Sequence, residues 1–261
     1  MSETMNLEFE QRSGHAVSRY GSAFVVAIER PEKANALDLD TCYAMSETFD
    51  EFAQDDSCIV GILLGHGRHF CAGMDLGLVS PGERVVLPET GFGGLTARWL
   101  DKPMIAAVHG AVFGGGLELA LACDLIVADA TARFCLPEPR IGQAALAGGL
   151  ERLPQRIGQA RALDMILASR EISAELAEAW GLVTRLCSDN QALSIAISLS
   201  GEISHSAPLS LKASKTVVRA HEYNLHSGIK QQQIDVMLDS QDGLEGAQAF
   251  KEKRLPVWSG R

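Results

Sequence analysis

The sequence of 261 residues has no apolar stretch long enough to cross a membrane. Its first residues, 1–6, are polar and acidic, so they lack the basic region and apolar core of a signal peptide and the arginines of a transit peptide. Positive charge is also scarce, because 23 Lys and Arg stand against 33 Asp and Glu and the formal net charge is −10. This charge argues against nucleic acid and anionic membranes as partners, but it allows a local basic pocket for phosphate groups.

Several chemical signatures are missing as well. The chain has no CxxC pair, and reduced core cysteines are expected over disulfides at Cys42, Cys58, Cys71, Cys123, Cys135 and Cys187. The spacings GxGxxG, GK[ST] and GxSxG are absent, which disfavours a dinucleotide-binding loop, a P-loop and a serine hydrolase. Together with the absent targeting segment, these features predict a cytoplasmic protein.

The most informative feature that is present is a run of three glycines, Gly114 to Gly116. It stands between an apolar run at 104–108 and an apolar helical pattern that continues to Cys123. Glycine lets backbone N–H groups approach a ligand, and a helix N-terminus adds unpaired N–H donors and a positive dipole end. The run therefore predicts a site for an anion or a developing oxyanion, with a tight, closely packed strand-to-helix turn as the alternative.

Two carboxylates accompany the glycines. Glu118 falls in the first turn of the predicted helix, and Glu138 stands between two prolines twenty residues later. Alone, Glu118 is typical of an exposed first-turn acid, and Glu138 is typical of a solvated loop residue. Together with an oxyanion site, the two glutamates predict acid–base chemistry at a carbonyl compound.

Strands that alternate with helices predict an α/β architecture. Strands are expected at 9–20, with a turn near Gly14, and at 24–28, 58–64, 104–108, 125–127 and 183–186. Helices are expected at 39–52, at 159–168, at 174–180 between an N-cap Ser173 and Gly181, and repeatedly after 191. Asp242 and Glu245 fit the start of a capping box. This pattern predicts two regions, a core of residues 1–190 and a helical region of residues 191–261.

A second glycine loop covers residues 65–75. Asp75 is expected to cap the following turn. His66 and His69 form an HxxH pair, but Gly65 and Gly67 argue against the helix that a metal site of this kind needs, so no metal is predicted. His109, at the end of a buried strand, is expected to be a hydrogen-bonded core histidine.

The chain resembles the crotonase superfamily of enoyl-CoA hydratases and isomerases along nearly its whole length. Four blocks carry the resemblance, in order and at the family's spacing: residues 30–37 (RPEKANAL), 70–76 (FCAGMDL), 108–120 (VHGAVFGGGLELA) followed by Cys123-Asp124, and 134–142 (FCLPEPRIG) with 148–153 (GGLERL). This resemblance implies a crotonase-like spiral of repeated ββα units with a helical C-terminal trimerisation region. Trimers of this family commonly pair into hexamers.

The resemblance also implies a site. The backbone N–H groups of Met74 and Gly115 would form an oxyanion hole for a thioester carbonyl, and Glu118 and Glu138 would be the catalytic pair. Binding of the CoA substrate would involve the 30–37 and 70–76 blocks, at Lys33, Ala34, Ala36, Ala72, Gly73, Asp75 and Leu76. CoA is part of the substrate, and no cofactor is expected. Residues 77–99 are expected to shape the acyl pocket.

The reaction that the resemblance implies is hydration of a trans-2-enoyl-CoA to a 3-hydroxyacyl-CoA. A Δ3,Δ2-enoyl-CoA isomerase is the alternative, and a non-catalytic CoA-binding or RNA-binding relative is a further one. The chain departs from the family at residues 143–146, which replace a Pro-Gly-rich turn, and at Pro139, which is expected to force Glu138 into an extended backbone.

Overall fold

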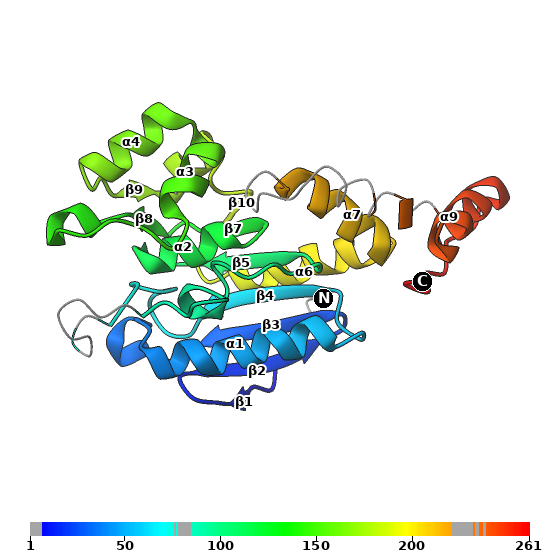
Figure 1. Ribbon diagram of the computed structural model, residues 1–261, viewed down its shortest axis with the longest axis horizontal. Coiled ribbons are helices and arrows are strands. Elements are labelled where there is room, and N and C mark those ends of the chain that lie inside the picture. Colours follow the sequence, from blue (N-terminus) through cyan, green and yellow to red (C-terminus); the bar gives the residue numbers. More distant parts are fainter. Residues whose placement is uncertain (1–6, 76, 78–84, 221–231, 233–234, 237–238) are drawn as a thin grey trace.

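The computed structural model describes residues 7–75, 77, 85–220, 232, 235–236 and 239–261. Its centre is a seven-stranded sheet in the order β1-β2-β3-β4-β5-β7-β10 (Figure 1). These strands are Glu10–Gln11, His15–Tyr20, Ala23–Ile28, Val60–Gly65, Met104–Val108, Leu125–Asp129 and Arg185–Cys187. The first three pair antiparallel, and from β3 onward each neighbouring pair is parallel. The α/β prediction is therefore confirmed.

Helices cover both faces of this sheet, and strand β3 shows why. Its alternate residues Phe24, Val26 and Ile28 belong to the hydrophobic cluster that includes the buried side chains of α1 (Leu39–Gln54). The intervening Ala23, Val25 and Ala27 belong to the cluster that includes α6 (Ala192–Ser204). A strand buried on both faces is apolar at every position, which is typical of parallel sheets.

Local signals place the helix ends. Helix α1 begins after Asp38, whose carboxylate accepts from Thr41 N at 2.8 Å, and its predicted core positions Met45, Phe49 and Phe52 are buried. Helix α5 (Ala174–Trp180) has Ser173 as its N-cap and ends at Gly181 in the left-handed conformation. The predicted buried face of α1 and the predicted ends of α5 are both confirmed. The ends of α5 could be predicted because side-chain capping and positive φ depend on neighbouring residues.

A second sheet has three strands, which come from parts of the chain that follow β5. Its order is β6-β8-β9, with strands Ala111–Phe113, Arg133–Cys135 and Ile172–Ser173. The remaining elements before α5 are η1 (Pro31–Lys33), η3 (Phe92–Gly94), α2 (Gly115–Ala122), η4 (Glu138–Ile141), α3 (Gly149–Ile157) and α4 (Gln159–Leu167). Helix α2 leads from β6 in the small sheet back to β7 in the large one, so its N-terminus directly follows the small sheet.

The C-terminal helices α7 (Pro208–Arg219) and α9 (Gln241–Glu252) extend to one side of the sheet, at the right of Figure 1. The capping box predicted at Asp242 is wrong, because α9 begins at Gln241 and Asp242 lies in its first turn. The Asp242 carboxylate instead accepts from the backbone N–H groups of Ser259 and Gly260, at 2.7 and 3.0 Å, and so holds the C-terminal segment.

Three sequence predictions fall partly outside the described residues. The apolar positions Ile234, Met237 and Leu238, which support the oligomer prediction drawn from the family resemblance, lie outside them. Leu76 and residues 78–84 of the predicted acyl-pocket segment 77–99 also lie outside them. Within the described part of the chain, no helix is long and apolar enough to cross a bilayer.

Asp124, which follows α2, fastens α7 to the core. Its carboxylate accepts from Lys215 Nζ at 2.8 Å, from Arg219 Nη1 at 2.9 Å and from Met104 N at 2.7 Å. The three charged side chains are only 9–17% exposed. We expect Asp124→Ala to lower the free energy of unfolding by about 3 kcal/mol, because it leaves two cations poorly solvated.

Urea denaturation would measure this loss. The matched control is Asp164→Ala, which breaks the exposed pair with Arg170 and should cost less than about 1 kcal/mol. Equal losses in the two variants would contradict the role assigned to Asp124.

Candidate active site

Glu118 lies in the first turn of α2, and glycine makes that turn possible. The N-cap Gly114 has φ 53° and ψ −126°, a conformation that side chains rarely adopt. Glu118 is 4% exposed, and its Oε1 accepts from the backbone N–H of Gly149, the first residue of α3, at 2.9 Å. Burial, with a smaller contribution from the charge of Glu138, raises the pKa of Glu118 to about 7, although hydrogen bonds from Gly149 and Ala147 lower it.

Glu138 is the second buried carboxylate and is 9% exposed. A Cβ placed on Gly114 would lie 2.9 Å from Glu138 Oε1, so this glutamate lies directly against the N-cap of α2. Its Oε2 is buried without a hydrogen-bond partner among the residues that the structure describes. Burial raises the pKa of Glu138 as well.

The backbone of Glu138 differs from the prediction. The sequence suggested an extended conformation before Pro139, but Glu138 is the first residue of the 3₁₀ helix η4. Two hydrogen bonds hold this turn, from Arg140 N to Pro137 O at 3.0 Å and from Gln143 N to Glu138 O at 3.0 Å. The prediction was wrong because the preference of a residue before proline for an extended backbone is weaker than these two hydrogen bonds together.

Two neighbouring carboxyl groups with raised pKa values can differ in protonation state at neutral pH, one ionised and the other protonated. The electrostatic interaction between Glu118 and Glu138 disfavours the doubly ionised state. One group can then act as a general base while the other acts as a general acid. The structure thus brings together the two glutamates that the sequence selected.

The raised pKa of Glu118 has a consequence for stability. A carboxyl whose pKa is about 7 in the folded protein and 4.5 in the reference state destabilises the fold increasingly as pH rises between these values. The full difference is about 3 kcal/mol at ~1.4 kcal/mol per unit. In Glu118→Gln the side-chain NH₂ replaces the oxygen that accepts from the Ala147 N–H. The loss of this hydrogen bond should cost about 1 kcal/mol of folding free energy.

We therefore expect Glu118→Gln to be more stable than the wild type by about 2 kcal/mol at about pH 8, and not at about pH 4. Chemical denaturation at both pH values measures the difference. The exposed Glu151→Gln should stay within about 0.5 kcal/mol of the wild type at each pH. A Glu118→Gln protein that is less stable than the wild type at about pH 8 would contradict the conclusion that burial favours the uncharged form of Glu118.

Met74 lies at a short parallel bridge with Leu37. Leu37 N donates to Gly73 O and Asp75 N donates to Leu37 O, both at 2.8 Å. Since successive amides of an extended chain point to opposite sides, the N–H of Met74 faces away from Leu37. The Met74 amide is thereby available for a ligand on that side.

Gly115 is the first residue of α2, where N–H groups have no partner within the helix. A Cβ on Gly73 would lie 3.1 Å from Gly115 N, so the loop that carries Met74 touches the start of α2. A Cβ on Gly115 would lie 2.6 Å from the ring of Phe92, which covers this glycine. The structure places Met74 and Gly115 in adjacent segments, and their joint use as an oxyanion hole stays a prediction.

The 30–37 segment is organised by Asn35, whose role the sequence did not indicate. Its side chain is buried, accepts from Arg30 N at 2.9 Å, and donates to the carbonyl oxygens of His66 and His69 at 2.8 and 2.7 Å. Ala34 and Asn35 both have positive φ, at 51° and 58°. Asn35 thereby joins the two loops in which CoA contacts are predicted.

The predicted CoA-contacting residues have different surroundings. Lys33 is exposed at the end of η1, whereas Ala36 is buried, with its N–H donated to Lys33 O and its carbonyl bonded to Arg30. Ala72 N donates to Ala34 O at 3.0 Å. The contact of these residues with CoA stays a prediction, and the side chain of Lys33 is available for a phosphate group.

Asp75 is buried and fulfils the capping prediction, since its Oδ1 accepts from Gly77 N at 3.2 Å. Its Oδ2 accepts from Arg30 at 3.2 Å, and Arg30 also pairs with Asp38 at 2.8 Å. Arg30 therefore joins the second glycine loop to the start of α1. The Asp75 carboxylate is engaged within the protein.

The histidines serve other contacts. His69 Nδ1 accepts from Ala111 N at 3.1 Å. His109 is hydrogen-bonded as expected, with Nε2 donating to Gly67 O at 3.0 Å, but it is half-buried and is not part of the core.

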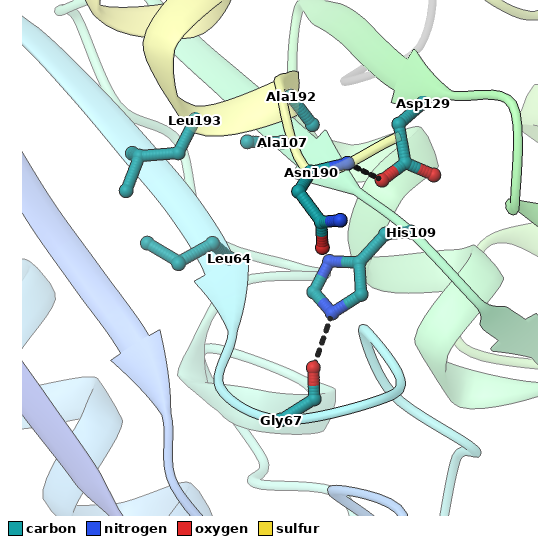
Figure 2. Close-up of a pocket in the computed structure, with 8 residues that line it drawn as sticks. All are labelled: Leu64, Gly67, Ala107, His109, Asp129, Asn190, Ala192 and Leu193. Carbon is teal, nitrogen blue, oxygen red and sulfur yellow. Dashed lines mark hydrogen bonds between the residues drawn. The ribbon is translucent and has the colours of Figure 1, made fainter. Parts of the chain in front are cut away.

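His109 lines a pocket of about 150 Å³ at the ends of β4, β5 and β7, which Figure 2 shows. The predicted site residues are not among those that line this pocket, which are Leu64, Gly67, Ala107, His109, Asp129, Asn190, Ala192 and Leu193.

Comparisons with known proteins agree with this fold. The family described as Enoyl-CoA hydratase/isomerase matches residues 18–261. A carnitinyl-CoA dehydratase of Proteus mirabilis is 40% identical over 96% of this chain and 99% of its own. Among solved structures, an enoyl-CoA hydratase of Mycobacterium tuberculosis is similar with a TM-score of 0.88 and 37% identity, over 95% of this chain and 99% of its own. A carnitinyl-CoA hydratase of Mycobacterium avium is similar with a TM-score of 0.77 and 36% identity, over 96% and 100%.

A crotonase-type α/β fold with two buried carboxylates at a glycine-rich helix start defines an enzyme of the hydro-lyase class. The chain belongs to the enoyl-CoA hydratase/isomerase family. The resemblance that the four sequence blocks indicated is confirmed, and so is the fold that it implied.

Proposed function

We propose that this enzyme catalyses the reversible addition of water to a trans-2-enoyl-CoA, giving a 3-hydroxyacyl-CoA. One observation carries the proposal: Glu118 and Glu138 are both buried with raised pKa values at the start of α2, and Glu138 Oε2 has no partner among the described residues. A buried oxygen of this kind is suited to bind a water or a substrate atom. The relatives named as hydratases and dehydratases support the same reaction class.

In the proposed mechanism the thioester carbonyl accepts hydrogen bonds from the N–H groups of Met74 and Gly115. These donors stabilise the enolate-like charge that develops when the water oxygen attacks C3. Glu118 and Glu138 hold that water, one carboxylate removes its proton, and a proton is delivered to C2. The C3–O and C2–H bonds form as the C2–C3 double bond is lost, so one water is consumed and no electrons are exchanged.

This chemistry needs no redox cofactor, because the addition of water leaves the overall oxidation level unchanged. CoA takes part as the carrier of the acyl group. We assign its recognition to the 30–37 and 70–76 segments, where Asn35 and Arg30 hold neighbouring loops together and Lys33 is exposed.

A second substrate is favoured by one observation, the identity of about 40% to carnitinyl-CoA dehydratases. The carnitinyl group is a 3-hydroxyacyl group that carries a quaternary ammonium at C4, so its dehydration is the reverse of the proposed reaction. A site with two carboxylates is electrostatically compatible with that cation. The two substrates differ only beyond C3, in the part of the pocket to which residues 77–99 are assigned.

A product assay tests the proposal. The purified enzyme is incubated with trans-2-butenoyl-CoA, its 4-trimethylammonium analogue and a 3-enoyl-CoA. Hydrated products are identified by mass, and isomers of equal mass are separated by chromatography against standards. We expect one or both 2-enoyl substrates to gain one water. Conversion of the 3-enoyl-CoA to the 2-enoyl isomer, without water gain on any substrate, would establish the isomerase instead, and thioester binding without turnover would establish a non-catalytic protein.

We also propose a trimer, or a pair of trimers, built through the helical region after residue 190. Exposed apolar side chains on the described part of this region support it, namely Val218, Leu244, Leu255 and Val257. A monomeric mass in light scattering at micromolar concentration would reject the oligomer.

A further inference from the structure

A buried arginine on α3 contacts two segments of the candidate active site, the turn that holds Glu118 and the segment near Gly115. Arg152 is 7% exposed, and its guanidinium donates to Ala147 O at 3.3 Å and to Thr96 O at 2.7 Å. A Cβ on Gly148 would lie 2.0 Å from Arg152 Nη1, so the guanidinium fills the space beside this glycine, whose φ is 103°. Arg152 therefore fixes the turn of residues 147–149.

The same turn holds Glu118. Its Oε1 accepts from Gly149 N at 2.9 Å, and the backbone of Ala147 also hydrogen-bonds to this carboxylate. The backbone that orients Glu118 is thus the backbone that Arg152 fixes from the other side. A shift of the turn would move both N–H donors away from the carboxylate.

The contact with Thr96 leads to the predicted oxyanion hole. Thr96 is buried, and its hydroxyl accepts from Phe92 N at 2.8 Å. Phe92 in turn covers Gly115, as the 2.6 Å approach to a Cβ there indicates. One guanidinium therefore connects the segment over Gly115 with the segment that holds Glu118.

Arg152 also acts on Glu118 by its charge. Two charged groups that act on this carboxylate are Glu138 on η4 and Arg152 on α3. Glu138 favours the protonated form of Glu118, whereas Arg152 favours the ionised form. Arg152 thereby opposes the effect of burial at neutral pH.

We propose that Arg152 is a positioning residue for the hydration reaction, which orients Glu118 through the 147–149 turn and Phe92 through Thr96. This inference rests on the proposed function of Glu118. Arg152 does not touch the substrate in this assignment, and its effect on the reaction passes through the two segments that it joins.

The test compares Arg152→Met, Arg152→Lys and a matched control, Arg156→Met. Arg156 lies one turn later on α3 and donates to Cys123 O at 2.7 Å, away from Glu118. The readouts are kcat and KM on trans-2-butenoyl-CoA as functions of pH, per folded enzyme, and the pKa of Glu118 from ¹³C-labelled glutamate in NMR spectra.

For Arg152→Met we expect a fall in kcat of about 10- to 100-fold with little change in KM, since a misplaced catalytic group costs turnover. The NMR-derived pKa of Glu118, and the limb of the pH profile that reports the titration of Glu118, should both move up by about one unit. Arg152→Lys should keep the pH limb, because the charge remains, and lose part of kcat, because an ammonium cannot form both contacts in the same fork. Arg156→Met should change stability alone.

An unchanged kcat and an unchanged Glu118 pKa in folded Arg152→Met would overturn the inference, as would equal effects in Arg156→Met. If Arg152→Met does not fold, Arg152→Lys carries the test, and a wild-type kcat in that variant would overturn the inference. The NMR measurement separates this inference from the proposed function. A wild type without hydratase activity contradicts the function, while the Glu118 pKa still reports whether Arg152 acts on the carboxylate.

Discussion

Replacement of either buried glutamate by glutamine should lower kcat on a trans-2-enoyl-CoA by about 10²- to 10⁴-fold, the usual contribution of a general acid or base. Glutamine keeps the shape of the side chain and can still accept from Gly149 N at position 118. It cannot take up or release a proton near neutral pH. We therefore expect Glu118→Gln and Glu138→Gln to bind the thioester normally and to lose turnover.

The double variant distinguishes a shared role from two separate ones. If both carboxylates act on one water, the double variant should be little slower than the slower single variant, because residues that act as a unit are not additive. Steady-state kinetics on a 2-enoyl-CoA and a 3-enoyl-CoA would measure this. An isomerase would show one essential glutamate and one dispensable glutamate on the 3-enoyl substrate.

A matched control is Glu29→Gln. Glu29 and Glu138 are the described residues that each have a buried carboxylate oxygen without a hydrogen-bond partner, but Glu29 is placed near His66. Its replacement should leave kcat within about twofold of the wild type. Full hydratase activity in Glu138→Gln, with this control also active, would refute the proposed mechanism.

Removal of the Gly115 N–H should have the next largest effect. Gly115→Pro eliminates the donor, and we expect kcat to fall by about 10²- to 10³-fold, the usual scale for one oxyanion-hole donor. Proline is tolerated at the first position of a helix, where Gly115 lies, so the substitution tests the N–H more than the helix. Met74→Ala should change turnover little, because it keeps its N–H.

Sterics must be separated from the lost donor, since any Cβ at position 115 approaches Phe92. Gly115→Ala keeps the N–H and introduces the same collision, and Phe92→Leu in the alanine background relieves it. We expect the relieved double variant to recover most of the activity, while Gly115→Pro with Phe92→Leu stays slow. Equal activity of these two double variants, with native circular dichroism spectra, would disprove the use of this donor.

Local patterns in the sequence determined much of this molecule. The apolar spacing at Met45, Phe49 and Phe52 indicated the buried face of α1, and Ser173 and Gly181 marked the two ends of α5. The glycine run indicated where α2 begins and hence that Glu118 lies in its first turn. These features depend on side-chain period, capping and positive φ, all of which involve residues within a few positions of each other.

Only the tertiary structure decided how the site is held. Glu118 receives its hydrogen bond from Gly149, 31 positions away, and Arg152 reaches Thr96, 56 positions away. No spacing in the sequence indicates such contacts, because they depend on how α3 packs against α2 and against the segment that follows η3. The raised pKa of Glu118 follows from the same packing, since burial and neighbouring charges are properties of the folded chain.

Two of the corrected predictions, at Glu138 and Asp242, were based on local preferences that other contacts outweigh. Glu138 adopts a 3₁₀ turn because hydrogen bonds to Pro137 and from Gln143 hold it, and Asp242 binds the backbone of Ser259 and Gly260 in preference to capping a helix. In both cases the local preference is worth about 1 kcal/mol. It is outweighed at Glu138 by the hydrogen bonds of the 137–143 turn and at Asp242 by the contacts with the C-terminal segment. The sequence by itself thus determined the family, the sheet and the two glutamates, whereas packing determined their protonation, their partners and their geometry.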